Sequence, residues 1–184
     1  MKVYTKKGDL GKTSILGEND IDKDDLRINA YGTVDELNSF VGQLSCFIDD
    51  RILLGELRDI QNVLFCVGSE LASTPDVFQK LNLDSVGVEE IDYLEKSIDR
   101  QTNELPVLQS FVLPGGSLSN ATAHIARTVC RRAERKCVTL SKVIEIRPEI
   151  ITYLNRLSDY FFTVARTMTV LTNSEEIEWK PKNR

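Results

Sequence analysis

The sequence predicts an all-α protein, a five-helix bundle preceded by an ordered glycine-rich segment. Two long stretches, residues 53–71 and 150–171, repeat apolar side chains at alternating steps of three and four, the spacing of a helix that buries one face. No stretch shows the sustained apolar and polar alternation of a half-buried strand. A chain of 184 residues, 41% of them hydrophobic, is long enough to bury a single core of this kind.

Composition and charge exclude several classes of protein. The formal net charge is -5, which argues against a general affinity for nucleic acid or for an acidic membrane. No apolar run approaches the ~20 residues that cross a bilayer, and the start of the chain, MKVYTKK, lacks the apolar core of a signal peptide. We therefore expect a cytoplasmic protein that binds neither membranes nor nucleic acid.

The cysteines and the single histidine argue against a disulfide framework and a protein metal site. No two cysteines form a C-x-x-C pair, so reduced thiols are expected at Cys46, Cys66, Cys130 and Cys137. Zinc and di-iron sites need several His or Cys ligands, whereas His124 is the only histidine. We expect a structural hydrogen-bonding role for His124 and predict no metal-ligating residues.

Residues 1–26 predict a structured loop, because they hold three glycines, many charges and little periodicity. Its centre, TKKGDLGKT at 5–13, contains a GKT, but a Walker A motif needs glycine where Lys6 stands. A glycine-rich loop with lysines and hydroxyls suits a phosphate. A solvated turn is the competing interpretation.

The first three helices are expected at residues 33–49, 53–71 and 88–102, with a loop over 74–87. Thr33 and Glu36 form a capping-box pattern. The first helix should therefore begin at Thr33 and place Asp35 near its positive end. The sequence STPD after residue 72 should end the second helix. The third helix is short and acidic and is expected on the surface.

The stretch 117–142 predicts a long helix with one apolar and one basic face. It carries six Lys and Arg against one Glu. At 100° per residue, the apolar stripe comprises Leu118, Ala121, Ile125, Val129, Ala133 and Leu140, and the polar side His124, Arg127, Arg131, Glu134 and Arg135. Arginines four residues apart repel each other. Arg127, Arg131 and Arg135 therefore indicate an anionic ligand that lies across them.

Two segments flank this basic helix. FVLPGG at 111–116 predicts extended chain ended by glycines, after which Ser117 or Ser119 should cap the helix. Pro148 suits the first turn of the last helix.

The last helix should carry a small polar group off its apolar seam, formed by Asn155, Asp159 and Arg166. The residues after Asn173 are polar and are expected to be loose. We expect one domain over residues 1–184, made of a loop segment at 1–26, a bundle at 27–173 and a polar tail at 174–184.

Four motifs stand in a fixed order along the chain. They are TKKGDLGKT (5–13), YGTVDELN (31–38), FVLPGG (111–116) followed by HIARTVCRRAER (124–135), and YLNRLSDY (153–160). Together they resemble the PduO-type corrinoid adenosyltransferases over nearly the whole chain. The resemblance implies a trimeric five-helix bundle with ATP between subunits. It also implies transfer of the 5'-deoxyadenosyl group of ATP to cob(I)alamin, with Mg²⁺, to give adenosylcobalamin and tripolyphosphate.

The same resemblance implies roles for individual residues. Nucleotide contacts carry over to Thr5, Lys6, Lys7, Gly8, Asp9, Thr13, Ser14 and Lys23, and to Arg131, Arg132, Glu134, Arg135 and Asn155. Arg131, Asp35 and Arg127 are the expected catalytic residues, and Asp35 of one subunit is expected to pair with Arg127 of its neighbour. Phe111 resembles the aromatic residue next to the corrin, although a core phenylalanine would give the same local sequence. The helical pattern places Arg132 nearer the apolar side, so an ion pair with the first helix is its alternative role.

The chemistry of this reaction suits such residues. Cob(I)alamin is a strong nucleophile, so the protein need only align C5' with cobalt and stabilise the leaving triphosphate. The resemblance further implies that cob(II)alamin is held without its lower ligand before it is reduced. No flavin or iron–sulfur motif is present, so an external reductase is the expected partner. A non-catalytic ATP-sensing trimeric bundle and a purely structural bundle are the alternatives.

Overall fold

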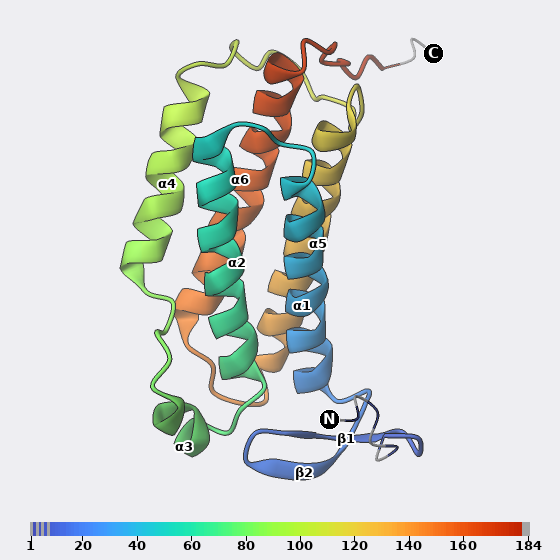
Figure 1. Ribbon diagram of the computed structural model, residues 1–184, viewed down its shortest axis with the longest axis vertical. Helices are drawn as coiled ribbons and strands as arrows, with labels where there is room; N and C mark the ends of the chain where they lie inside the picture. Colours follow the sequence, from blue (N-terminus) through green and yellow to red (C-terminus); the bar gives the residue numbers. More distant parts are fainter. Residues whose placement is uncertain (1, 3, 5, 7, 182–184) are drawn as a thin grey trace.

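Five long helices stand side by side in the computed structural model, which describes residues 2, 4, 6 and 8–181 (Figure 1). They are α1 Leu26–Ser45, α2 Arg51–Leu71, α4 Val88–Thr102, α5 Leu118–Leu140 and α6 Pro148–Leu171. A short helix α3 Pro75–Phe78, a 3-10 turn Gln79–Leu81 and a hairpin of β1 Lys12–Ile15 and β2 Glu18–Asp22 lie at one end of the bundle. The predicted five-helix bundle is confirmed.

Helix α1 begins well before the predicted capping box. The Asp25 carboxylate caps it by accepting a hydrogen bond from the amide two residues on, at 2.7 Å. The Thr33 hydroxyl instead donates to the Asn29 carbonyl at 2.7 Å, a bond that Thr often makes inside a helix. The predicted start at Thr33 is therefore wrong, and Asp35 stands in the middle of α1 rather than near its positive end.

A two-stranded antiparallel hairpin occupies the segment that was expected to be only a loop. Lys12 pairs with Asp22 and Thr13 with Ile21 in the β-ladder, and the Lys12 ammonium lies 2.6 Å from the Asp22 carboxylate. Both strands are short and mostly exposed. Because neither strand buries one complete face, the alternation that signals a strand is missing from the sequence.

The turn of this hairpin is docked on the end of α2. The Leu16 amide donates to the Ala72 carbonyl at 2.9 Å, and the Thr74 amide donates to the Leu16 carbonyl at 2.8 Å. Gly17 has a φ of 98°, and a Cβ there would lie 2.3 Å from the Thr74 hydroxyl oxygen. Only glycine allows this close approach. The hairpin is therefore attached to the bundle at its turn as well as through α1.

Helix α5 packs against α1 and α6 through a face of small side chains. Its fully buried small residues are Ala123, Ala126, Cys130, Ala133 and Cys137. This face is rotated from the predicted apolar stripe, because Leu118 and Ile125 are 70% and 42% exposed whereas His124 is buried. The predicted cap is confirmed, since the Ser117 hydroxyl accepts a hydrogen bond from the Asn120 amide at 3.1 Å. The predicted apolar face is thus confirmed at Val129, Ala133 and Leu140, and the predicted assignment is wrong for Leu118, Ile125 and His124.

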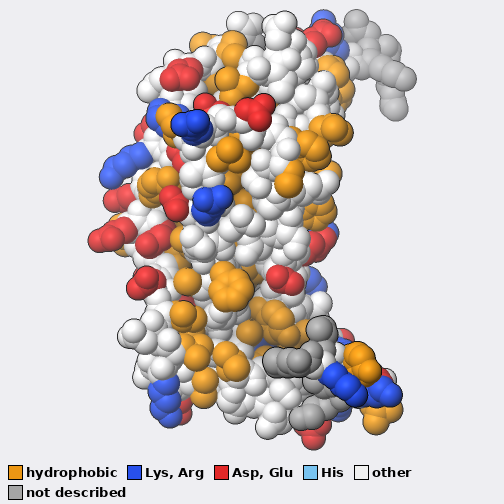
Figure 2. Space-filling view, in the orientation of Figure 1, with side chains coloured by type: hydrophobic (Ala, Val, Ile, Leu, Met, Phe, Trp, Pro, Cys, Tyr) orange, Lys and Arg blue, Asp and Glu red, His pale blue; other side chains and the backbone are white. Residues whose placement is uncertain are grey.

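The segment 74–87 was expected to be a loop and instead contains α3 and the 3-10 turn. Thr74 precedes Pro75 at the first helical position, where proline is tolerated. On the face shown in Figure 2, hydrophobic side chains are scattered among charged ones along the length of the bundle, and Phe65 of α2 is 70% exposed. None of the helices in the described part of the chain combines the length and hydropathy needed to cross a bilayer.

The chain after α6 folds back on the loop before α5 as a strap, residues 174–181. The Trp179 amide donates to the Phe111 carbonyl at 2.7 Å, and the Leu113 amide donates to the Ile177 carbonyl at 2.8 Å. These bonds form a short antiparallel bridge centred on Val112. The expectation of a loose tail is therefore wrong for these residues, whose backbone groups are paired.

Arg166 of α6 anchors both the strap and the loop. Its guanidinium is buried and donates to the two oxygens of Glu176 at 2.8 and 3.2 Å, and to the Pro106 carbonyl at 2.8 Å. The expectation that Arg166 lies with Asn155 and Asp159 is wrong, since both of those side chains are exposed. The buried guanidinium of Arg166 thus holds the end of the chain to the bundle through polar contacts.

Removing the carboxylate of Glu176 should destabilise the fold. Glu176→Ala leaves the Arg166 charge buried with only a backbone acceptor, and breaking a buried pair in this way costs about 3 kcal/mol. Glu175→Ala, at the exposed neighbouring position, should cost less than about 0.5 kcal/mol. Urea unfolding of the two variants measures both values, and equal stabilities would show that the strap is not anchored through this pair.

Candidate active site

The N-terminal segment forms a loop that a lysine closes. Lys23 Nζ donates to the Gly8 carbonyl at 2.7 Å, and a Cβ on Gly8 would meet that nitrogen at 2.9 Å. Lys6 is exposed and has a φ of 61°. Thr5 and Lys7 lie outside the described residues. The other predicted residues of this loop are exposed or half-buried, at Asp9, Thr13 and Ser14.

Three arginines on α5 have no carboxylate partner. Arg127 is half-buried, and Arg131 and Arg135 are exposed; among the described residues, no Asp or Glu forms an ion pair with any of them. Burial, and next the charge of Arg131, lowers the pKa of Arg127 from its ordinary value, although guanidinium groups stay charged in proteins. Such a row is suited to an anion with several oxygens, such as a polyphosphate.

Arg132 lies beside this row and makes an ion pair of its own. Its guanidinium contacts the carboxylate of Glu36 on α1, which is the alternative role expected from the helical pattern. The two side chains are 45% and 46% exposed, and exposed pairs of this kind contribute at most about 1 kcal/mol. A ligand could therefore draw Arg132 away at little cost.

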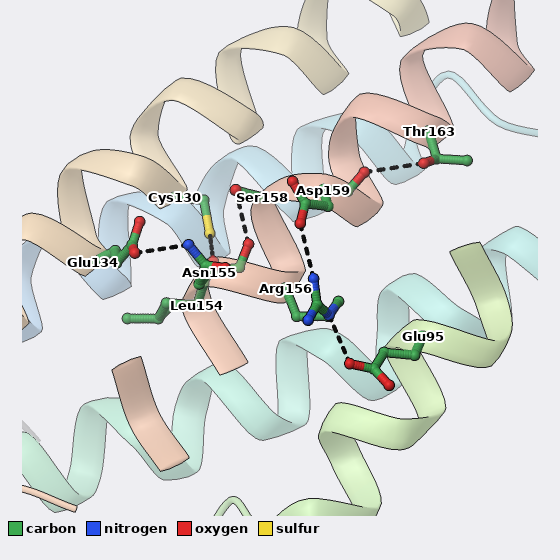
Figure 3. Close-up of polar contacts among 9 residues, drawn as sticks. All are labelled: Glu95, Cys130, Glu134, Leu154, Asn155, Arg156, Ser158, Asp159 and Thr163. Atoms are coloured by element: carbon green, nitrogen blue, oxygen red, sulfur yellow. Dashed lines mark hydrogen bonds and ion pairs between the residues drawn. The ribbon is translucent and has the colours of Figure 1, made fainter. Parts of the chain in front are cut away.

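Glu134 and Asn155 join α5 to α6 next to the arginines (Figure 3). Asn155 Nδ2 donates to Glu134 Oε1 at 3.0 Å. The next residue of α6, Arg156, contacts Glu95 of α4 at 2.9 Å and Asp159 at 3.1 Å. The structure thus brings Glu134 and Asn155 together as predicted, whereas the carboxylate of Asp159 is held by Arg156.

His124 is buried between α5 and α6 rather than displayed on the basic side. Its Nδ1 accepts a hydrogen bond from Arg127 Nε at 3.2 Å, and its ring packs edge-on against Phe162 with 6.1 Å between centroids. Burial, and next the charge of Arg127, lowers the pKa of His124 to about 4, so the ring stays neutral and can accept this bond. The predicted structural hydrogen-bonding role of His124 is confirmed.

Phe111 lies in the loop before α5, at the end of the bundle opposite the hairpin (Figure 1). Its side chain is 80% exposed, which excludes the alternative of an ordinary core phenylalanine. The ring meets Trp179 edge to face, with 6.5 Å between centroids and 74° between planes. Trp179 belongs to the strap and was missed by sequence reasoning, because three acidic residues precede it in a segment that reads as solvated.

A pocket of about 550 Å³ lies away from all of these residues, between the end of α2 and the start of α6. Both of its arginines are already engaged: Arg147 donates to Glu70 at 2.8 and 2.9 Å, and Arg27 donates to the Ser73 carbonyl at 2.5 Å. None of the predicted site residues lines it. The predicted residues Arg131, Arg132 and Arg135 instead lie exposed along α5.

Metal and thiol chemistry find little support within the described ranges. No group of three or more His, Cys, Asp and Glu side chains there could hold a metal ion. All four cysteines are free thiols, as predicted. Burial raises the pKa of Cys137 to about 12 and that of Cys130 well above its ordinary value, so both stay protonated.

These features define a class of protein: a helical bundle with a row of arginines along the surface of one helix. Comparison with known proteins identifies the family within this class. The family described as cobalamin adenosyltransferase matches residues 3–168. The corrinoid adenosyltransferase of Bacillus subtilis (strain 168) is 45% identical over 185 residues, which cover 98% of this chain and 93% of the relative. That of Homo sapiens is 37% identical, covering 95% of this chain and 72% of the relative.

A solved structure supports the same conclusion. It is of a variant of the PduO-type ATP:corrinoid adenosyltransferase from Lactobacillus reuteri complexed with cobalamin and ATP, with a TM-score of 0.90 and 38% identity. The match covers 98% of this chain and 100% of that chain. This chain belongs to the cobalamin adenosyltransferase family.

The buried histidine should give the fold a specific pH dependence. His124 titrates near pH 6.5 in an unfolded chain and at about 4 in the folded one, so the unfolded chain binds more protons between these values. The folded state therefore loses stability as pH falls through this window. His124→Gln removes the effect, and the wild-type loss from pH 7 to pH 4 should exceed that of the variant by on the order of 2 to 3 kcal/mol. Urea unfolding at the two pH values measures the difference, and parallel losses would contradict the burial of a neutral ring.

Proposed function

We propose that this protein transfers the 5'-deoxyadenosyl group of ATP to cob(I)alamin, giving adenosylcobalamin and tripolyphosphate. The observation that carries the proposal is that Arg131 and Arg135 are exposed on α5 and form no ion pair with any carboxylate of the described residues, in a chain of the cobalamin adenosyltransferase family. A relative of the same fold is complexed with cobalamin and ATP. The curated relatives are corrinoid adenosyltransferases, so a non-catalytic ATP-sensing bundle is not favoured.

The nucleotide would lie between the N-terminal loop and the surface of α5. Its proposed contacts are Thr5, Lys6, Lys7, Gly8, Asp9, Thr13, Ser14, Lys23, Arg131, Arg132, Glu134, Arg135 and Asn155. Guanidinium and lysine groups suit the triphosphate. Glu134 and Asn155, which hold each other at 3.0 Å, offer a carboxylate and an amide to the hydroxyls of the nucleoside.

The reaction needs alignment and charge stabilisation rather than acid or base catalysis. An electron pair on Co(I) forms the bond to C5' while the C5'–O bond breaks and its electrons leave with the triphosphate. Arg131 and its neighbours would stabilise the charge that develops on this leaving group. Mg²⁺, when bound, would neutralise part of the phosphate charge, and since the described residues offer no carboxylate cluster it would be held mainly by phosphate oxygens.

The corrin would lie at the end of α5 where Phe111 is exposed. An apolar ring against the lower face excludes both the lower ligand and water, which makes the one-electron reduction of cob(II)alamin easier. The electron must come from an external reductase in the cytoplasm, because the sequence holds no flavin or iron–sulfur motif.

We further propose a homotrimer in which Asp35 of one subunit pairs with Arg127 of the next, each subunit being one domain. Two observations support association through α1 and α5. Asp35 is exposed and has no ion pair among the described residues, and Leu118 and Ile125 expose apolar surface along α5. Light scattering should give about three times 20.8 kDa, and a monomer mass would overturn the arrangement.

Product formation tests the proposed function directly. Anaerobic incubation with ATP, Mg²⁺ and chemically reduced cobalamin should consume the Co(I) spectrum and yield adenosylcobalamin. ATP with Mg²⁺ at ~100 times its dissociation constant should also stabilise the fold by about 2.7 kcal/mol. A rise in melting temperature without product would favour a nucleotide sensor, and no rise at all would favour a structural bundle.

Arg131→Lys should be a poor substitute although it keeps the charge. A planar guanidinium holds two phosphate oxygens at once, whereas an ammonium acts as a single point charge. We expect kcat/KM to fall about tenfold or more, with an unchanged melting temperature. Arg58→Lys, at an exposed position of α2, is the control and should keep wild-type kinetics. Wild-type turnover in Arg131→Lys would mean that the arginine row is only a solvated surface.

A further inference from the structure

Phe111 lies on a loop that has little structure of its own. The loop runs from the end of α4 at Thr102 to the start of α5 at Leu118, and most of its side chains are exposed. Among the described residues, the only aromatic ring that packs against Phe111 is that of Trp179. A phenylalanine that is 80% exposed would otherwise rotate between side-chain rotamers. Something outside the loop must fix the ring if it is to meet a flat ligand in one orientation.

The strap fixes the backbone on both sides of Val112. The Phe111 carbonyl accepts from the Trp179 amide at 2.7 Å, and the Leu113 amide donates to the Ile177 carbonyl at 2.8 Å. In this antiparallel pairing, Phe111 and Trp179 are hydrogen-bonded neighbours. Their side chains are therefore brought to the same side of the pairing.

Two buried polar side chains hold this arrangement to the bundle. Arg166 contacts both the loop, through the Pro106 carbonyl, and the strap, through Glu176. On the other side of Phe111, the buried Asn120 accepts from the Gly115 amide at 2.9 Å and donates to the Ala165 carbonyl at 2.9 Å. The position of Phe111 thus depends on α6 and on the strap more than on its own loop.

The strap also approaches so closely that a glycine is needed opposite it. Gly116 has a φ of 88°, and a Cβ there would lie 3.0 Å from the Glu175 carbonyl oxygen. The double glycine before α5 therefore serves the docking of the strap as well as the turn into the helix.

We propose that Trp179 is a positioning residue for Phe111, holding its ring in the orientation that meets the lower face of the corrin. The inference rests on the proposed function. The two rings meet edge to face, 6.5 Å apart at 74°, an arrangement that aromatic pairs favour. Trp179 is 49% exposed, so burial in the core does not explain a tryptophan here. Trp179 affects the reduction of cob(II)alamin rather than adenosyl transfer, because adenosyl transfer uses only the upper face of the corrin.

The contact itself can be tested without substrate, because Trp179 is the only tryptophan in the chain. In Phe111→Ala, its fluorescence should shift to longer wavelength and acrylamide should quench it more strongly. Val107→Ala, at an 85% exposed apolar position of the same loop, is the matched control and should leave the emission unchanged. Identical emission in wild type and Phe111→Ala would show that the rings do not meet in solution and would overturn the proposal.

The role is tested with Trp179→Ala, Trp179→Phe and Val107→Ala in two assays. One starts from cob(II)alamin with reduced flavin as the one-electron donor, and the other from chemically reduced cob(I)alamin. Trp179→Ala should lower the cob(II)alamin rate by up to about tenfold, the most that an edge-to-face contact is worth, and should lower the four-coordinate Co(II) signal in electron paramagnetic resonance. Its cob(I)alamin rate should stay within about twofold of wild type. Trp179→Phe should restore most of the loss, and Val107→Ala should behave as wild type.

Each outcome bears on one proposal. A wild-type four-coordinate signal in folded Trp179→Ala overturns the positioning role, and so does an equal fall in both assays, which would indicate only a loss of folded protein. Failure of the wild-type protein to convert cob(I)alamin would instead overturn the proposed function, and the inference with it.

Discussion

The close packing of α5 against α1 and α6 is the constraint on which the rest of the structure depends. Alanine and cysteine side chains at positions such as Ala126, Cys130 and Ala133 are fully buried, and such small residues let helices approach closely. Once this face is buried, the rotation of α5 is fixed. Arg131 and Arg135 must then be exposed, while Arg127 lies at the boundary, where His124 accepts its hydrogen bond.

Buried polar contacts add to apolar burial in holding the remaining elements to this core. Glu56 is buried on α2 and accepts from Tyr160 of α6 at 2.9 Å and from Arg100 of α4 at 2.7 Å. Arg166 likewise holds the strap and the loop before α5, by donating to Glu176 and to the Pro106 carbonyl. Buried polar groups specify one partner, because any other arrangement leaves them unpaired. Peripheral segments with few apolar residues therefore have single positions on the bundle.

Periodicity of large apolar residues predicted the helices well and their orientation less well. The seams of α2 and α6 are built from Leu, Ile, Val and Phe, and their positions were evident from spacing alone. The core face of α5 consists of residues that are not read as hydrophobic anchors, so Leu118 and Ile125 were assigned to a core that they do not enter. The start of α1 was misplaced because a capping-box pattern at Thr33 competes with Asp25, and only the hairpin, a tertiary feature, decides between them.

The candidate site likewise consists of features that the sequence predicted and features that it did not. The family motifs named the arginines, the loop and Phe111, since these are properties of local sequence. The Arg132 to Glu36 pair was expected from the helical pattern as an alternative. The strap was not predictable, because its pairing with the loop joins segments about 65 residues apart and depends on backbone hydrogen bonds, which leave no periodic pattern.

The arrangement of the site on one helix explains how an open surface can support this reaction. Phe111 precedes α5 and Arg131 stands thirteen residues after its first residue, which corresponds to roughly 20 Å along a rigid helix. In the proposed site, the separation between the corrin end and the phosphate end is therefore set by the most closely packed element of the fold. A strong nucleophile that needs no general base requires just such fixed positions. The only histidine, with its pKa lowered to about 4, is accordingly used to hold an arginine in place and not to move a proton.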